Sequence, residues 1–507
     1  MTARYVARKP IGVRIWVLAA AMLSILLIAA PAAQAAVINV IDVIPNAASN
    51  ESTQNSEPSL AVNPLNPLQM VSAAFTASFS ALGVVTPYWE SSNGGTTWTF
   101  YDNLNTLDKS IAWRQDAVAA LTTTLFPSGS NNGINTFTTA GATFGAPINS
   151  FNPGRVLDQP WVRTGSSGQT YVTYNDLSNA GGRTATIRVS LDNGVTYAAP
   201  VILETVNPAG GQDAPSVRMA VNGSTVYGAF TRWGAVIEND ANGIRFGNSQ
   251  IVVVKSTNSG VSFSAGVTAA TATGFFANRV NTPLTLGQER TSSDIAIAVD
   301  PKNANRVIVV YADAPGANGA GVLQLHVMES TNGGATWTNK FTTPANVRAG
   351  LPALSILANG AVGLLYQLYN PATNQLSQHF LTTTDDFATT SDSLLGTQTN
   401  ATPAATFSPY LGDFFDLTSV DNSFYGIFSA SNADNGVLAS FPSVSFQRNL
   451  VGTPGNATFQ LRDISGNENI AFSIDPFVFS FTIGNPPSLA LLGIGLLGLA
   501  ALRRHRK

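Results

Sequence analysis

The chain has 507 residues, of which only 11% are charged, and it contains no cysteine. The absence of cysteine excludes a disulfide framework, a thiolate metal site and a cysteine nucleophile. Eight of the 26 basic residues lie in the first 14 and last 5 positions, which leaves 18 basic against 29 acidic residues in the body, a net charge of about −11. Such a balance excludes nucleic-acid binding by a basic surface.

Residues 1–35 have the layout of a secretory signal peptide. A basic segment, Arg4–Arg14, precedes the almost wholly apolar run Trp16–Ala30, and Ala33-Gln34-Ala35 has the form of a cleavage site. The alternative is a transmembrane anchor, but the small residues directly after the apolar run argue against it. We expect export, a mature chain that begins near Ala36, and an N-terminal strand and linker over 36–55.

Four stretches then repeat one pattern, Ser-x-Asp/Asn-x-Gly-x-Thr/Ser-aromatic. They cover residues 91–98, 190–197, 256–263 and 330–337. Asn and Asp tolerate the left-handed region and bond their own backbone, while Gly adopts positive φ without steric cost. Each copy therefore predicts a tight turn between two strands, and four copies indicate a repeat architecture.

The pattern resembles the Asp box (BNR repeat) of sialidase-like β-propellers. The resemblance covers most of residues 56–450 and implies an all-β fold, a β-propeller of four-stranded blades. In that family the boxes lie on outer hairpins, so we expect a structural role for their residues, which are Ser91, Asn93, Gly95, Trp98, Ser190, Asp192, Gly194, Tyr197, Ser256, Asn258, Gly260, Phe263, Ser330, Asn332, Gly334 and Trp337.

The number of blades is predicted from the innermost strands. Candidate starts lie at Glu57, Gln115, Asp158, Asp213, Ser293, Leu351 and Gly412. Seven blades are therefore favoured, and six remain the alternative if 116–144 is an insertion. Residues 137–144 and 383–387 resemble incomplete boxes, and 451–484 predicts further strands that either close the ring with the N-terminal segment or form a small appendage.

Ligand sites in propellers form where the innermost strands converge on the central funnel. Side chains that open these strands are candidates for acid/base work, namely Asp116, Asp158, Asp213, Asp294 and Asp413, with Glu57 in the first unit. Packed carboxylates raise one another's pKa, which suits this chemistry or a cation site; the alternative is that they cap turns. Candidates for substrate binding are Arg114, Arg163, Arg218, Arg232, Trp161 and Tyr410; the alternative for the arginines is pairing with acidic neighbours.

The residues leave catalysis open. Sialidases use an arginine triad, a Tyr nucleophile assisted by Glu, and an Asp acid/base, and their first arginine stands in an Arg-Ile-Pro motif. Here the equivalent place carries Glu57-Pro58-Ser59, and spacing identifies no Tyr–Glu pair. If the chain is an enzyme, the resemblance implies a glycoside hydrolase of sialidase-like type, but a fold does not imply an activity.

No cofactor is expected. His326 and His379 are isolated, and neither a nucleophile elbow nor a phosphate loop occurs. The stretch Asn239-Asp240-Ala241-Asn242-Gly243 is a weak candidate for Ca²⁺, but it lacks the later Glu of an EF-hand loop, so an ordinary turn is favoured.

The C-terminal segment 485–507 resembles the PEP-CTERM sorting signal of Gram-negative bacteria. Asn485-Pro486-Pro487 precedes the apolar run Ser488–Leu502 and a basic end. The resemblance implies removal of the tail by an exosortase in cells that make exopolysaccharide, although the family's Pro-Glu-Pro is altered here. The alternative is a plain membrane anchor, which the basic end would orient.

These features predict an exported, envelope- or matrix-associated propeller that binds glycan or exopolysaccharide at its funnel. The alternatives are a non-catalytic structural or adhesion scaffold, and a glycoside hydrolase that uses funnel carboxylates. Expected partners are the glycan, the export machinery and an exosortase, with no nucleic acid.

Overall fold

The computed structural model describes residues 37–484, apart from 84, 107, 129–130, 141–142, 207–216, 240–243, 278–294, 316–320 and 408–409. The signal peptide, the sorting tail, Asp213 and Asp294 lie outside the described residues, so these assignments stay predictions.

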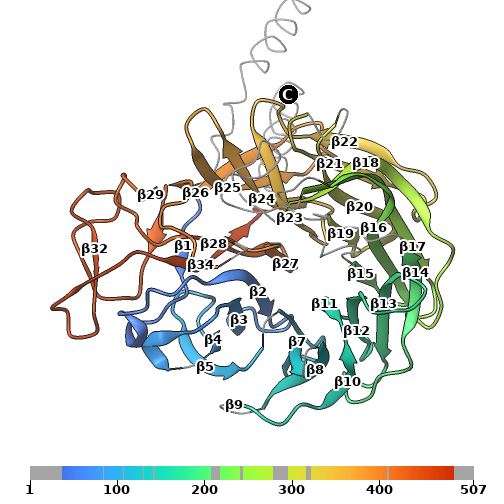
Figure 1. The fold of residues 1–507 in the computed structure, drawn as a ribbon, viewed down its shortest axis with the longest axis horizontal. Coiled ribbons are helices and arrows are strands. Elements are labelled where there is room, and N and C mark those ends of the chain that lie inside the picture. Colours follow the sequence, from blue (N-terminus) through green and yellow to red (C-terminus); the bar gives the residue numbers. More distant parts are fainter. Residues whose placement is uncertain are drawn as a thin grey trace, which may run out of the picture. The chain divides into compact units, whose positions relative to one another are not determined.

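Seven sheets of four or five strands make up most of the described chain (Figure 1). Sheet 1 contains β2 (Ser56–Val62), β3 (Met70–Phe75), β4 (Thr86–Ser91) and β5 (Thr99–Leu104). Sheet 2 contains β6 (Lys109–Trp113), β7 (Ala120–Ser128), β8 (Asn131–Ala140) and β10 (Asn149–Arg155), with β9 (Thr143–Phe144) paired to β8. Sheet 3 contains β11 (Leu157–Thr164), β12 (Thr170–Asp176), β13 (Arg183–Ser190) and β14 (Val201–Val206).

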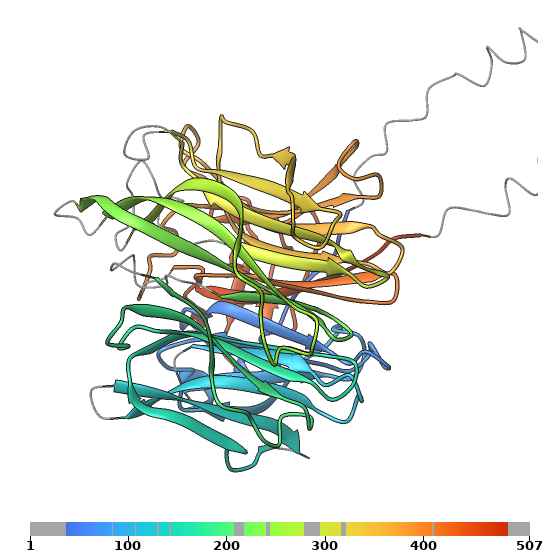
Figure 2. The ribbon, with the colours of Figure 1, turned by 90° about the vertical axis from the view of Figure 1, so that its right-hand side faces the viewer.

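The next two sheets follow the same order. Sheet 4 contains β15 (Arg218–Asn222), β16 (Thr225–Asn239), β17 (Ile244–Ser256) and β18 (Val267–Ala277). Sheet 5 contains β19 (Ile295–Asp300), β20 (Asn303–Asp313), β21 (Gln324–Ser330) and β22 (Thr338–Thr342). The turned view in Figure 2 shows the long hairpin of β16 and β17 (green) reaching beyond the neighbouring strands.

The last two sheets include strands from distant parts of the chain. Sheet 6 contains β23 (Arg348–Ile356), β24 (Val362–Asn370), β25 (Gln375–Thr383), β26 (Ser391–Thr399) and β29 (Ala439–Ser440). Sheet 7 contains β27 (Asp416–Val420), β28 (Ser423–Ser431), β34 (Ile474–Thr482), β1 (Val40–Asp42) and β30 (Val444–Ser445). A separate three-stranded sheet contains β31 (Leu450–Val451), β32 (Gln460–Arg462) and β33 (Asn469–Ile470), and the short 3₁₀ helices η1 (Asn46–Ala48) and η2 (Ser80–Leu82) complete the elements.

The prediction of an all-β fold built largely from four-stranded antiparallel sheets is confirmed, since no α-helix occurs among the described residues. Each innermost strand contacts the next, in the order β2, β6, β11, β15, β19, β23 and β27, and β27 contacts β2 (Figure 1). A buried apolar cluster joins every neighbouring pair of sheets, including sheets 6 and 7 and sheets 7 and 1. The innermost strands β2 and β19 are buried at every position because the sheets pack against neighbours on both faces.

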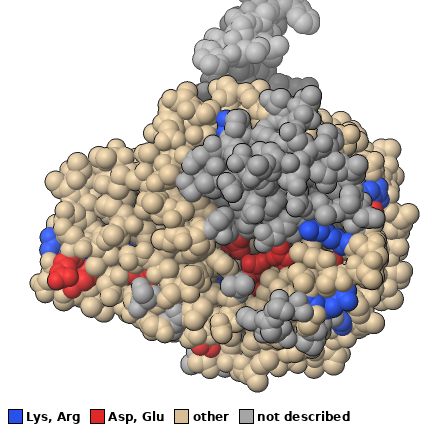
Figure 3. Space-filling view, in the orientation of Figure 1, with Lys and Arg blue, Asp and Glu red and all other residues tan. Residues whose placement is uncertain are grey.

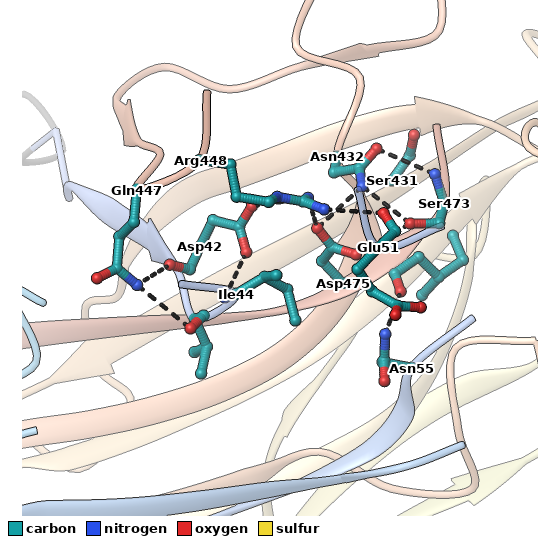
Figure 4. Close-up of polar contacts among 12 residues, drawn as sticks. Asp42, Ile44, Glu51, Asn55, Ser431, Asn432, Gln447, Arg448, Ser473 and Asp475 are labelled. Carbon is teal, nitrogen blue, oxygen red and sulfur yellow. Dashed lines mark hydrogen bonds and ion pairs between the residues drawn. The ribbon is translucent and has the colours of Figure 1, made fainter. Parts of the chain in front are cut away.

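Sheet 7 joins the two ends of the described chain. β34 pairs with β28 on one side and with β1 on the other. Beside this junction, Arg448 donates to Asp42 and Asp475, and both carboxylates are fully buried (Figure 4). The 451–484 segment therefore supplies both an interior strand of sheet 7 and the small separate sheet.

One predicted innermost strand was wrong. The second begins at Lys109, not at Gln115, and residues 115–118 form the turn between β6 and β7. The prediction failed because the stretch Gln115-Asp116-Ala117-Val118 resembles the acidic start of the other units, whereas the true strand begins with a lysine.

The four repeated turns share one hydrogen-bond geometry. The first residue, serine in all four, accepts a bond from the glycine N–H at 2.9 Å in each copy. The Asn or Asp Oδ1 then accepts a backbone N–H four residues later, at 2.8–3.0 Å. Thr383 and Asp385 make the same bonds, with Phe387 at positive φ in place of glycine. The polar atoms of the box are thus occupied within the turn.

Gly260 tests this account of the turns. Its φ is +81°, and a Cβ there would lie 2.9 Å from Tyr171 Cε1. We expect Gly260→Ala to lower the free energy of unfolding by roughly 1–3 kcal/mol, measured in urea. Gly223→Ala is the control, because its φ is +58° with open space around it, so it carries the backbone cost alone. Equal losses in both variants would contradict the packing argument.

Candidate functional site

Three innermost strands carry the same irregularity close to their first residues. Glu57, Gln159 and Leu351 each have a φ of 51–52°, and each precedes a proline. The strand pairing shifts by a bulge at each place. A non-glycine residue in this conformation costs of order 1–3 kcal/mol, and such bulges are frequent beside functional sites. We call this end of the innermost strands the mouth.

Side chains of sheets 3 and 7 meet at the mouth. Gln159 Nε2 donates to Asp413 Oδ2 at 3.4 Å, and the rings of Trp161 and Phe414 are in edge contact at 4.9 Å. Two residues further along, Arg163 forms an ion pair with Asp416 at 3.2 Å. Sheets 3 and 7 are not neighbours in the order of contacts, so these pairs cross the space between the innermost strands, which we call the channel.

Two guanidinium groups lie over the ring of Trp161. The Cζ atoms of Arg163 and Arg218 are 4.6 and 4.2 Å from its ring centre, close enough for cation–π attraction. Arg218 also donates to Gln159 Oε1 at 2.9 Å and lies 5.6 Å from the ring of Phe414. The structure therefore brings together three of the predicted binding residues.

The described carboxylates of the mouth are buried and take part in hydrogen bonds or ion pairs. Asp413 N donates to Glu57 Oε1 at 3.4 Å, and Asp158 Oδ1 accepts the Gln159 N–H at 2.9 Å. Asp416 was not predicted; besides Arg163, it accepts a bond from Ser59 Oγ at 3.0 Å. These groups are arranged as hydrogen-bond acceptors that fix the strands of three sheets.

Lys109 is a buried amine that the sequence did not single out. It is 1% exposed, and Nζ has no hydrogen-bond partner among the described residues. Nζ lies 5.6 Å from the centre of the Phe75 ring. Burial lowers its pKa to about 7, against the opposing charges of Glu57 and Asp108. Its position at the start of β6 would have been noticed had that strand been placed correctly.

The other predicted residues lie elsewhere. Asp116 and Arg114 pair with each other in the turn after β6, at the opposite end of the strand from Lys109, so the placement of Asp116 at a strand opening was wrong. Arg232 on β16 binds Glu204 and Gln250 away from the innermost strands. Tyr410 is fully buried, and its hydroxyl donates to Pro403 O at 2.7 Å, away from the group formed by Trp161, Phe414 and Arg218.

A cavity of about 370 Å³ occupies the channel toward the turns that follow the innermost strands. Residues from all seven innermost strands line it, and Val62, Val221, Val299, Ile356 and Val420 are among its apolar members near those turns. A small space of about 30 Å³ adjoins it and is lined by Trp161, Arg218 and Phe414. In Figure 3 acidic side chains gather near the middle of the face, with basic side chains beside them.

Within the described ranges, no three His, Asp or Glu side chains are grouped to hold a metal ion. The weak calcium candidate lies almost wholly outside them, since 240–243 are not described. A search of the described part of the chain for a helix long and apolar enough to cross a membrane found none.

No protein-family model matches the chain, and no curated protein matches it either. It is similar in fold to an ulvan lyase of a polysaccharide lyase family, with 10% identity over 78% of this chain and 96% of the other and a TM-score of 0.49. Similar structures also include an α-L-arabinanase of Penicillium chrysogenum, with 11% identity over 71% of this chain and 98% of the other and a TM-score of 0.39. Another is a subtype N10 neuraminidase-like protein of A/little yellow-shouldered bat/Guatemala/060/2010, with 12% identity over 66% of this chain and 96% of the other and a TM-score of 0.38. At these identities and TM-scores the likeness carries no argument about activity.

Proposed function

We propose that the seven sheets are the blades of a closed, seven-bladed propeller. The cyclic contacts of the innermost strands and the buried cluster between every neighbouring pair of sheets support this architecture. The six-bladed alternative treats residues 116–144 as an insertion, but β7 and β8 of this range belong to the sheet formed by β6 to β10. β34 and β1 would close the ring from the two ends of the chain.

We further propose that the propeller binds glycan at the mouth and is exported to the cell envelope or extracellular matrix. The observation that carries the binding proposal is the meeting of Trp161 and Phe414 with Arg218, Gln159 and Asp413. Aromatic rings stack on the apolar faces of sugars, while amide, guanidinium and carboxylate groups bond their hydroxyls. Export and anchoring rest on the sequences of 1–35 and 485–507.

Binding without hydrolysis suits this geometry best. Hydrolysis needs one carboxyl group to donate a proton and a second to attack or to activate water. In the mouth, Asp416 is paired with Arg163, and Asp413 accepts a bond from Gln159. The contacts that cross the channel are also compatible with the second candidate, a non-catalytic scaffold, and glycan binding separates the two.

A glycan array probed with the full chain in detergent tests the proposal. We expect Arg218→Met to weaken binding of the best ligand at least tenfold, about 1.4 kcal/mol, because the guanidinium is lost from the mouth. Arg232→Met is the matched control, since this arginine is bound to Glu204 on the outer strands; it should change the Kd less than twofold. Equal effects of the two variants, or an array without ligands, would favour the scaffold.

A further inference from the structure

Six large apolar side chains are exposed at one end of the sheets. Each is 55–76% exposed, and they are Leu65, Leu68, Val118, Leu191, Val195 and Val261. They belong to the turns after innermost strands β2 and β6 and to the repeated turns of sheets 3 and 4. We call this end of sheets 1–4 the turn face; it lies opposite the mouth.

Hydrogen bonds between turns make the turn face one continuous surface. Within sheet 1, Gly94 N donates to Leu68 O at 2.9 Å, and Asn63 Nδ2 reaches Ala117 O of sheet 2 at 3.4 Å. Asn149 Nδ2 of sheet 2 donates to Gly194 O of sheet 3 at 3.0 Å, and Gln169 Nε2 of sheet 3 donates to Ser259 Oγ of sheet 4 at 3.5 Å. Single exposed apolar residues are ordinary, but a group on one contiguous face indicates an interaction surface.

The other end of the sheets differs. Among the described residues at this end of sheets 1–4, the exposed large apolar side chains are Val85 and Val156, at 38% and 41%. They precede β4 and β11, in connections at the level of the mouth. In the described parts of sheets 1–4, the apolar exposure is therefore concentrated on the turn face.

The chain also leaves the described structure at the level of the turn face. Thr482, the last residue of β34, pairs with Ser423, directly after the turn that follows β27. Ile483 N donates to Asn422 O at 3.0 Å in that turn. The apolar run 488–502 begins five residues later, and five residues span at most about 18 Å.

We propose that the turn face rests on the surface of a lipid bilayer, with the mouth directed away from it. Leucine and valine side chains gain free energy when they leave water for the interfacial region, and a tail inserted nearby holds them there at high effective concentration. The inference rests on the proposed anchoring by the tail, not on the identity of the glycan.

The charges of the turn face point to a neutral lipid surface. Arg114 is neutralised by Asp116, and Lys255 Nζ lies 5.5 Å from the ring centre of Tyr227. No cluster of unpaired cations accompanies the six apolar residues in the described turns, so an anionic headgroup is not required. The association should persist at high salt, unlike one that polybasic segments drive.

The absence of cysteine makes this orientation measurable. Single variants Leu65→Cys, Val118→Cys and Val261→Cys carry a fluorophore on the turn face, and Val85→Cys and Val156→Cys carry the same fluorophore at the other end. The full chain is reconstituted into phosphatidylcholine vesicles with and without nitroxide lipids. We expect at least twofold quenching of the three turn-face labels and less than 1.2-fold quenching of the two controls, unchanged in 0.5 M NaCl.

Equal quenching at both ends, quenching of the controls alone, or no quenching at all would overturn the proposal. A label that responds to protein concentration in detergent would instead assign the turn face to contacts between copies of the chain. The variant Leu65→Ser/Val118→Ser/Val261→Ser, labelled at Leu191→Cys, should lose most of the quenching. Glycan binding is measured on the same vesicles, so a lack of glycan binding at the mouth and a lack of the proposed membrane orientation are distinguished from each other.

Discussion

Replacing Arg448 by methionine should lower the free energy of unfolding by roughly 3–5 kcal/mol. Arg448 is fully buried and binds Asp42 at 3.1 Å, Asp475, and the carbonyl oxygen of Glu51 at 3.0 Å (Figure 4). Methionine fills a similar volume but leaves two buried carboxylates without a cation. Urea unfolding of the full chain at pH 7, followed by tryptophan fluorescence, measures the loss.

The position of this network explains why the loss should be large. Asp42 lies on β1, Asp475 on β34, and Arg448 in the segment that leads to the small separate sheet. Burial raises the pKa of Asp42 well above its ordinary value, and the charge of Asp475 adds to this, whereas Arg448 lowers it. Removing the arginine therefore loosens the strands that complete sheet 7.

A neutralised network is the matched control for this prediction. In Arg448→Met/Asp42→Asn/Asp475→Asn no buried charge is left without a partner, so we expect recovery of at least half of the lost stability. If the triple variant is as unstable as Arg448→Met, the loss comes from packing or shape, and the account based on buried charge is wrong.

Replacing Lys109 by methionine should remove a pH dependence of stability. The pKa of a lysine in the unfolded chain is about 10.4, whereas burial lowers that of Lys109 to about 7 in the native state. Between these values the unfolded chain holds a proton that the native chain lacks, so native stability rises with pH. The contribution from pH 7 to pH 9 is roughly 2 kcal/mol, and below pH 7 it levels off.

Urea unfolding at pH 7 and pH 9 compares the wild type with Lys109→Met. The wild type should gain roughly 2 kcal/mol more than the variant over this interval. Lys302→Met is the same substitution at an exposed lysine and should leave the gain unchanged. If Lys109→Met also leaves it unchanged, Lys109 keeps its proton in the native state, and its interaction with Glu57 outweighs the cost of burial.

The repeated turns could be predicted from the sequence because their physics is local. Ser, Asp or Asn, and Gly at fixed spacing satisfy one another within eight residues, so the pattern determines the turn wherever it stands. The general location of the mouth followed from the same repeats, since prolines mark the starts of β2, β11 and β23. Trp161, Arg163 and Arg218 were found in this way.

The remainder of the site depends on contacts between residues far apart in the chain. Asp416 lies 253 residues after Arg163 and 357 after Ser59, and no spacing rule connects them. Asp116 was misplaced because a turn can imitate the acidic start of a strand, and Lys109 was overlooked because burial, which alters its pKa, is invisible in sequence.

The sequence by itself determined most of the strands, the repeated turns and the apolar and basic character of both ends, because these features depend on residues close together in the chain. The tertiary structure alone decided which strand opens sheet 2, which side chains cross the channel, and how Arg448 joins β1 to β34. The physical reason is that burial and long-range pairing set the charge state and position of these groups, and both arise only when distant sheets pack together.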